Sequence, residues 1–164
     1  IEKYRADKSY EMVINTIQDL IKIKPDDPDS YIELANAYKT LLKFSDGIKV
    51  LNDAKNKFSD NQNIYFNLIR LSYLNKEYTN TIAICKEALT KFPNTEKILN
   101  SLAESYTSNN QDDEALQIYK DLALKTGKES YYIAAGNCFL KPAKQTMLFH
   151  FILKLKILML PVPS

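Results

Sequence analysis

The chain has little of what most catalytic and metal-binding motifs need. Its 164 residues include 3 glycines, 2 cysteines, 1 histidine and no tryptophan. So few glycines leave almost nothing for a phosphate-binding loop. Two cysteines and one histidine cannot form a disulfide framework or a four-ligand Cys/His zinc site. Neither sign of charge dominates, because 22 basic and 20 acidic residues are interspersed and give a net charge of +2. The sequence therefore lacks the basic patch that nucleic acid or an anionic membrane would require.

The remaining composition is that of an ordinary folded protein. Hydrophobic residues make up 45% of the chain and charged residues 26%, which excludes a disordered tail and a collagen-like fibre. Scarce glycine, abundant tyrosine and leucine, and the absence of valine-rich runs predict helices. The length fits one domain or one short array of repeats.

Residues of one class recur along the chain at a step of about 34 residues. Within each unit the apolar positions lie about three or four residues apart, as one face of an α-helix requires. A bundle of unrelated helices would not need the same residue class at a fixed step, so the pattern favours repeats. One predicted helix per unit carries the columns Tyr10, Phe44 and Tyr78; Ile14, Ile48, Ile82 and Leu116; Ile17, Leu51, Cys85 and Tyr119; and Leu20, Ala54, Ala88 and Leu122, followed by the breakers Pro25, Ser59, Pro93 and Gly127.

A second predicted helix precedes each of these. Residues 28–30, 60–61 and 93–95 carry the cap or turn chemistry that starts such a helix. Each unit is therefore expected to be a helix, a short turn, a second helix and a loop. The columns of this helix are Tyr31, Tyr65 and Leu99; Leu34, Leu68 and Leu102; Ala35, Ile69 and Ala103; and Tyr38, Ser72 and Tyr106, with a further copy one residue early at Tyr132, Ala135, Gly136 and Phe139.

These columns resemble the tetratricopeptide repeat family. Its signature is an aromatic residue, leucine with a small residue, tyrosine, and later alanine, an aromatic residue, alanine and proline. Over roughly residues 1–140 the resemblance implies an all-α fold, an α-solenoid of stacked antiparallel helix pairs in a right-handed superhelix. The copies are Tyr31, Leu34, Ala35, Tyr38 and Ala54; Tyr65, Leu68, Thr81, Cys85, Ala88 and Pro93; and Leu99, Leu102, Ala103, Tyr106, Ala115 and Tyr119, with departures at Ser59, Ser72, Leu122 and Gly127.

The predicted organisation is a repeat array over residues 1–140. It consists of a partial repeat 1–27, repeats 28–61, 62–95 and 96–128, and the first helix of a further repeat, 129–140. Residues 10–25 resemble the second helix of a copy whose first helix is mostly missing before Ile1. Because helix pairs bury their faces against neighbours and array ends need polar caps, we expect a fragment of a longer chain.

Residues 141–164 break the pattern and form an atypical hydrophobic C-terminal segment, expected to be helical to about residue 160. Residues 147–160 are apolar on nearly every face. Three interpretations remain open: a last helix covered by further repeats or a partner, a product of a reading-frame error, and, least favoured, a membrane-surface segment. The run is too short to span a bilayer, which takes about 20 residues. The nucleotide sequence around Pro142 would separate the first two.

The sequence offers little for catalysis. His150 lies in the atypical segment without a serine or cysteine beside it. Cys85 and Cys138 fall on helix faces that pack, where buried thiols are inert. The acidic pairs at 26–27 and 112–113 fit capping and solvation and lack the spacing of a calcium loop. We therefore expect no enzyme, no metal and no cofactor.

The resemblance implies a binding function instead. In this family the first helices line a concave groove that receives a peptide or a helix of a partner protein. Asparagine amides suit an extended peptide backbone, Phe66 and Tyr73 would supply apolar contact area, and Arg70 and Lys97 would favour an acidic residue or carboxylate. The groove candidates are Asn36, Lys39, Phe66, Asn67, Arg70, Tyr73, Lys97, Asn100 and Glu104, with Ile32, Asn63, Ser101 and Asn137 beside them.

One subgroup of the family binds the carboxylates of chaperone C-termini with a clamp of lysine, arginine and asparagine. Asn36, Asn67 and Lys97 match three of its positions. Ile32 and Ser101 stand where a lysine and an arginine are needed, and losing them should remove most of the charge-assisted recognition. The clamp is therefore disfavoured.

The sequence thus predicts a non-enzymatic scaffold with a protein or peptide partner. The alternatives are an accessory repeat domain of a larger enzyme or membrane-associated complex, an RNA-binding helical repeat, and an inner face that is merely solvated. The near-neutral charge disfavours nucleic acid, and only the C-terminal segment offers membrane contact. Two cysteines weakly favour the cytoplasm.

Overall fold

The computed structural model describes residues 2–138, with side chains from Ser9 onward. The hydrophobic run 147–160 and His150 lie outside the described residues. Every element in the described part of the chain is an α-helix, which confirms the all-α prediction. The helices are α1 (Glu2–Ile23), α2 (Pro28–Thr40), α3 (Phe44–Lys57), α4 (Gln62–Leu74), α5 (Tyr78–Lys91), α6 (Glu96–Ser108), α7 (Asp112–Thr126) and α8 (Glu129–Cys138).

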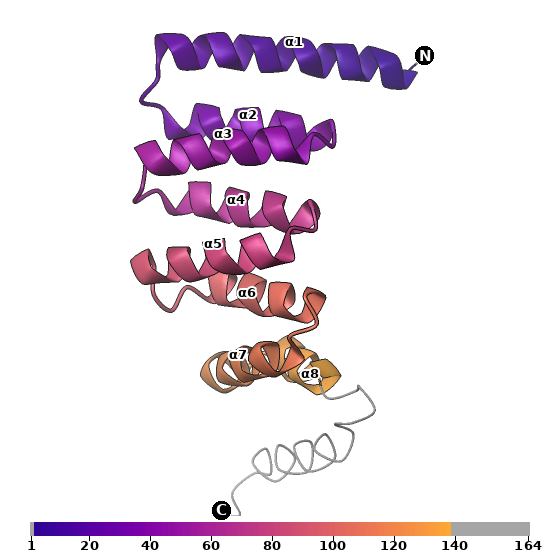
Figure 1. Ribbon diagram of the computed structural model, residues 1–164, viewed down its shortest axis with the longest axis vertical. Coiled ribbons are helices and arrows are strands. Elements are labelled where there is room, and N and C mark those ends of the chain that lie inside the picture. Colours follow the sequence, from indigo (N-terminus) through magenta and orange to yellow (C-terminus); the bar gives the residue numbers. More distant parts are fainter. Residues whose placement is uncertain (1, 139–164) are drawn as a thin grey trace, which may run out of the picture. The chain divides into compact units, whose positions relative to one another are not determined.

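The chain divides into two compact units, Ile1–Ser101 and Leu102–Ser164, and α6 crosses the division. In the first unit, helices that follow one another in sequence also pack against one another from α1 to α5, and α2 additionally contacts α4. Figure 1 shows these helices as successive layers joined by turns at alternate ends. In the second unit, α7 packs against α8.

The recurrent apolar columns form the cores of both units. Ala35, Leu51, Ala54, Leu68 and Ala88 are fully or almost fully buried. Burying a leucine side chain contributes about 1.5–3 kcal/mol, and the alanines let neighbouring helices approach closely. The positions that recur along the sequence are therefore the buried ones, because a buried position accepts only residues of suitable size and polarity.

The turns between paired helices share one backbone feature. Leu42, Lys76 and Asn110 adopt φ values of 59°, 61° and 60°, in the left-handed region that residues other than glycine and asparagine seldom visit. They occupy equivalent places after α2, α4 and α6. This left-handed residue lets the chain reverse within a few residues and start the second helix of each pair.

Side chains cap two of the first helices. Asn61 Oδ1 accepts hydrogen bonds from the backbone N–H groups of Asn63 at 3.0 Å and Ile64 at 3.3 Å, as the sequence predicted for the start of α4. At α2 the prediction of a cap within residues 28–30 was wrong. Asp27 is the cap, and residues 28–30 form the first helical turn, because Pro28 fits a first helical position that needs no N–H donor.

The first helix differs from its predicted counterpart. Residues 10–25 were expected to form a second helix beginning near Tyr10, but α1 already begins at Glu2. Phe44 and Tyr78, in the same column as Tyr10, are the first residues of α3 and α5. In α1 no left-handed turn residue interrupts the helix before Tyr10, so it continues toward the N-terminus and leaves Tyr10 exposed.

Candidate partner-binding face

The site that the sequence predicts is carried by α2, α4 and the start of α6, which all belong to the first unit. On α2, Asn36 and Lys39 are half-buried, whereas Leu34 and Ala35 are buried. Lys39 Nζ donates a hydrogen bond to Asn36 Oδ1 at 2.8 Å. The spacing of one helical turn brings these two polar side chains together. This bond uses the Asn36 amide oxygen, so the amide nitrogen has no hydrogen-bond partner among the described residues and remains available as a donor.

Lys39 of α2 and Arg70 of α4 influence each other electrostatically. Burial lowers the pKa of the Lys39 ammonium first, and the nearby positive charge of Arg70 lowers it further. Arg70 is exposed and has no hydrogen bond or ion pair with another described residue. Two cations thus share one part of the surface without an acidic side chain between them, and an anionic ligand would relieve their repulsion.

Phe66 and Lys97 make a second contact, between α4 and α6. The Lys97 ammonium lies 4.2 Å from the centre of the Phe66 ring, within the range of a cation–π interaction. Phe66 is half-buried, and Lys97 is exposed. The ammonium therefore stays accessible to a ligand while the ring provides apolar area beside it.

Asn67 is held against its own helix. Its side-chain Nδ2 donates to the Asn63 carbonyl oxygen one turn earlier, at 2.9 Å. This bond fixes the amide orientation and leaves the Oδ1 acceptor without a hydrogen-bond partner among the described residues. Tyr73 instead lies in the last turn of α4, where its ring packs on Tyr78 with centroids 5.4 Å apart.

The structure therefore brings Asn36, Lys39 and Arg70 into one group and Phe66 and Lys97 into another. We call the surface formed by these residues together with Asn67 the α2–α4–α6 face. Asn100 is half-buried on the first-unit part of α6, whereas Glu104 is exposed in the second unit. The α2–α4–α6 face is thus defined without Glu104 or Asn137.

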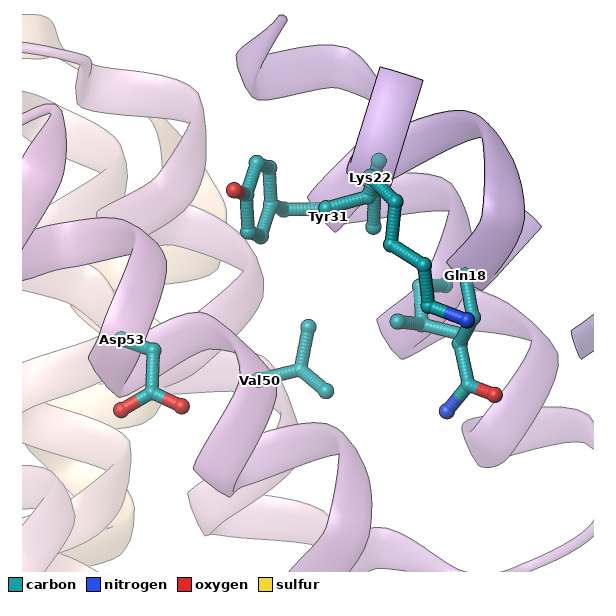
Figure 2. A pocket seen from close by; sticks show the side chains of 7 residues that line it. Gln18, Lys22, Tyr31, Val50 and Asp53 are labelled. Carbon is teal, nitrogen blue, oxygen red and sulfur yellow. The ribbon is translucent and has the colours of Figure 1, made fainter. Parts of the chain in front are cut away.

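A cleft that the sequence analysis missed lies between α1, α2 and α3 of the first unit. It has a volume of about 370 Å³ and is lined by Gln18, Ile21, Lys22, Tyr31, Leu34, Val50 and Asp53. Figure 2 shows these side chains around the opening. The apolar residues that line this cleft look like ordinary core positions of the repeat, so they did not indicate it. Only a comparison of the polar residues that recur about every 34 positions could have predicted the cleft.

A column of aromatic residues was also missed. The ring of Tyr31 meets that of Phe58 edge to face with centroids 5.6 Å apart, and Tyr65 meets Phe92 in the same way at 5.7 Å. Phe58 and Phe92 end α3 and α5 as their C-cap residues. Their common step along the chain was a readable signal, since a residue just beyond a helix can still pack on the next one.

The described residues hold no group of three or more histidine, cysteine, aspartate or glutamate side chains arranged to bind a metal ion. Cys85 and Cys138 are both buried. Among the helices of residues 2–138, none is long and apolar enough to cross a membrane.

Comparison with known proteins relates part of the chain to a family. Residues 72–136 match the model of the tetratricopeptide repeat family. Curated protein sequences give no match. The predicted resemblance is confirmed by this match and by the similar structures that follow.

Three solved structures show the breadth of the structural similarity. MamA is similar with a TM-score of 0.74 and 17% identity, over 93% of this chain and 90% of that chain. The thermophilic TPR protein TTC0263 of Thermus thermophilus has a TM-score of 0.63 and 22% identity, over 77% of this chain and 71% of its own. The TPR-like repeats of a putative kinesin light chain from Podosopora anserina have a TM-score of 0.68 and 13% identity, over 95% of this chain and 90% of that chain. These similarities confirm an all-α helical repeat solenoid.

Proposed function

On the premise that residues 72–136 match the tetratricopeptide repeat family, we propose that the chain binds an extended acidic segment of a partner protein on the α2–α4–α6 face. The family match and the similar structures support a protein–protein interaction scaffold. Proteins of this kind are typically non-enzymatic.

The observation that carries the proposal is that this face holds three cations, two of which lie near each other. Lys39 and Arg70 lie close enough for the charge of Arg70 to lower the pKa of Lys39. Lys97 adds a third positive charge over the Phe66 ring. The nearest acidic residues on α2, Asp29 and Glu33, are exposed and form no ion pair with these cations. A carboxylate-bearing ligand would supply the missing counter-charge.

The polar and apolar groups beside the cations fit a peptide backbone. Asn67 presents a fixed acceptor, because its amide nitrogen is held by the Asn63 carbonyl. Asn36 is held in turn by Lys39, so both amides are oriented before a ligand binds. Preorganised groups lose less entropy on binding, and the half-buried Phe66 ring offers area for an apolar side chain of the ligand.

The test is binding of the full chain to immobilised peptide libraries that differ in charge. We expect acidic peptides to bind more tightly than neutral or basic peptides of the same length, and the difference to shrink with added salt because exposed charges are screened. Equal binding of acidic and basic peptides would refute the proposed ligand chemistry.

Removing two of the contacts should weaken this binding without unfolding the protein. The double variant Asn67→Ala/Arg70→Ala loses one amide and one charged contact, and hydrogen bonds to charged groups contribute about 1.5–3 kcal/mol. We therefore expect the affinity for the best acidic peptide to fall by about tenfold to a hundredfold. Titration calorimetry measures the affinity, and circular dichroism checks the helices.

A matched control removes one cation and one amide from another helix. Lys49 and Asn56 are exposed on α3, so the double variant Lys49→Ala/Asn56→Ala should bind the peptide as the unmodified chain does. If Asn67→Ala/Arg70→Ala also binds with unchanged affinity, the site lies elsewhere.

A further inference from the structure

We propose that the cleft between α1, α2 and α3 receives a lysine side chain of a partner protein, whose ammonium pairs with Asp53. This is a second site, independent of the α2–α4–α6 face. On α2 the cleft is lined by Tyr31 and Leu34, whereas Asn36 and Lys39 belong to the face. At about 100° of rotation per residue, these two pairs point in different directions from the helix.

The next helix pair along the first unit supplies the reason for choosing lysine. Between α3 and α5, Lys55 Nζ lies 2.7 Å from Glu87 Oε2 in an ion pair. The hydroxyl of Tyr65 donates to Glu87 Oε1 at 3.0 Å. The Lys55 ammonium also lies 6.0 Å from the centre of the Tyr65 ring. A lysine of the chain itself therefore fills this position, held by a carboxylate and an aromatic ring.

One repeat earlier, the same positions surround the cleft, but the lysine is missing. Ile21 occupies the position of Lys55, Asp53 that of Glu87, and Tyr31 that of Tyr65. Isoleucine is shorter than lysine and carries no charge. The space that the Lys55 side chain takes up between α3 and α5 is therefore open between α1 and α3, as the cleft of about 370 Å³.

The carboxylate at this position has no partner within the described part of the chain. Asp53 is exposed and forms no ion pair or hydrogen bond with another described residue. The Tyr31 hydroxyl, which corresponds to the Tyr65 hydroxyl, donates instead to the Pro25 carbonyl oxygen at 3.1 Å. Asp53 and Tyr31 thus correspond to the carboxylate and the aromatic ring that hold Lys55, but no cation of the described residues lies between them.

Neighbouring cations do not replace the missing lysine. Lys22 pairs with Asp19 at 2.8 Å, and Figure 2 shows its ammonium across the cleft from Asp53. Lys57, one turn after Asp53, pairs with Asp26 at 2.8 Å and donates to the Pro25 carbonyl at 2.7 Å. Lys49, one turn before Asp53, is exposed and unpaired among the described residues.

The walls of the cleft suit the aliphatic stem of a lysine. Ile21, Leu34 and Val50 line it with apolar side chains, and lysine buries its methylene groups along such surfaces while its charged end stays at the rim. Asp53 stands at this rim as an exposed carboxylate. The cleft thus offers an apolar slot and a terminal counter-charge, which together match lysine.

The test is an NMR titration of the full chain with a capped pentapeptide, Ala-Ala-Lys-Ala-Ala, and with its norleucine analogue, which keeps the stem and lacks the ammonium. We expect the lysine peptide to shift backbone amide signals of residues 18–22 and 50–53, and the norleucine peptide to bind at least about fivefold more weakly. Equal binding of both peptides would overturn the proposal, because the cleft would then select apolar groups only.

Two variants and one control assign the effect to the cleft. Asp53→Asn removes the carboxylate from an exposed position and should weaken binding of the lysine peptide about fivefold or more. Ile21→Lys places a lysine where Lys55 stands in the next pair and should abolish binding by filling the slot. Asp46→Asn removes another exposed carboxylate of α3 and should leave binding unchanged.

The test remains decisive even if one variant fails to fold. Ile21 packs against the core cluster around Ile14, so circular dichroism must show that Ile21→Lys keeps its helices. If that variant unfolds, Asp53→Asn alone decides, since an exposed side chain can change without loss of the fold. Unchanged binding by Asp53→Asn, or signal shifts confined to the α2–α4–α6 face, would contradict the site.

Discussion

Leucine and lysine rarely adopt a left-handed backbone, yet Leu42 and Lys76 do so at the turns before α3 and α5, at φ values of 59° and 61°. The conformation costs about 1–2 kcal/mol for such residues and much less for asparagine or glycine. Leu42 also exposes 72% of its surface, so burial of its side chain does little to offset the cost of this conformation. The turn geometry is therefore maintained by the packing of the helices on either side.

Leu42→Asn should stabilise the first unit. Asparagine tolerates the left-handed region, as Asn110 does at the equivalent turn before α7, so we expect the free energy of unfolding to rise by about 1 kcal/mol. Denaturant titration followed by circular dichroism measures the change. The matched variant Leu41→Asn, at the non-left-handed neighbour, should not stabilise. A loss of stability in Leu42→Asn would contradict the account of this turn.

Ser72 is a second local weakness. It is fully buried in α4, and its Oγ has no hydrogen-bond partner among the described residues. Because a buried unsatisfied hydroxyl costs about 1–3 kcal/mol, Ser72→Ala should leave the free energy of unfolding unchanged or raise it by about 1 kcal/mol. Thermal and denaturant unfolding test this, with buried, hydrogen-bonded Thr81 changed to alanine as the destabilising comparison. A loss above about 1 kcal/mol in Ser72→Ala would imply a partner for this hydroxyl.

At the scale of elements, the cap of α2 links helix stability to pH. Hydrogen bonding from the Ser30 hydroxyl is the main cause that lowers the pKa of Asp27 below its ordinary value of 3.8. A carboxyl group with a lowered folded-state pKa stabilises the fold above its unfolded pKa. This contribution is lost as the pH falls through the lowered value. The ionised cap is therefore fully effective near neutral pH and ineffective in strong acid.

The stability difference between the unmodified chain and Asp27→Asn should thus be constant above about pH 5 and fall on acidification below about pH 4. Asparagine keeps a capping oxygen but does not ionise, so it isolates the effect of the charge. Asn61→Ala, at the cap of α4, serves as the control, because an amide cap does not titrate. Its cost of about 1 kcal/mol should not change over the same range. A pH-independent difference for Asp27→Asn would contradict the role of its charge.

The repeat columns made the paired helices predictable, and other features of the elements were not. Burial restricts residue class at positions such as Leu51 and Leu68, so sequence alone located the helices around them. The turns at Leu42 and Lys76 could not be predicted, because neither residue favours the conformation that packing imposes. The start of α1 at Glu2 was also missed. The repeat pattern predicted a turn before Tyr10, but no residue there breaks the helix, so α1 extends to Glu2.

At the scale of the whole molecule, a small net charge conceals locally distinct surfaces. The chain carries a net charge of +2, but the α2–α4–α6 face gathers Lys39, Arg70 and Lys97, whereas the cleft between α1 and α3 presents an unpaired Asp53. Sequence placed the three cations on first helices. It could not show that Lys39 and Arg70 lie near each other, because that depends on the contact between α2 and α4. Their role in binding stays a prediction.

The most direct measurement of the central claim reverses the charge of the α2–α4–α6 face. Peptide selection from a charge-balanced library should be carried out with the full chain and with its double variant Arg70→Glu/Lys97→Glu. Both residues are exposed, so the variant should keep its helices by circular dichroism. We predict that the unmodified chain enriches acidic peptides and that the variant loses this preference or selects basic peptides. The same acidic enrichment in both proteins would contradict the claim that this face binds the partner.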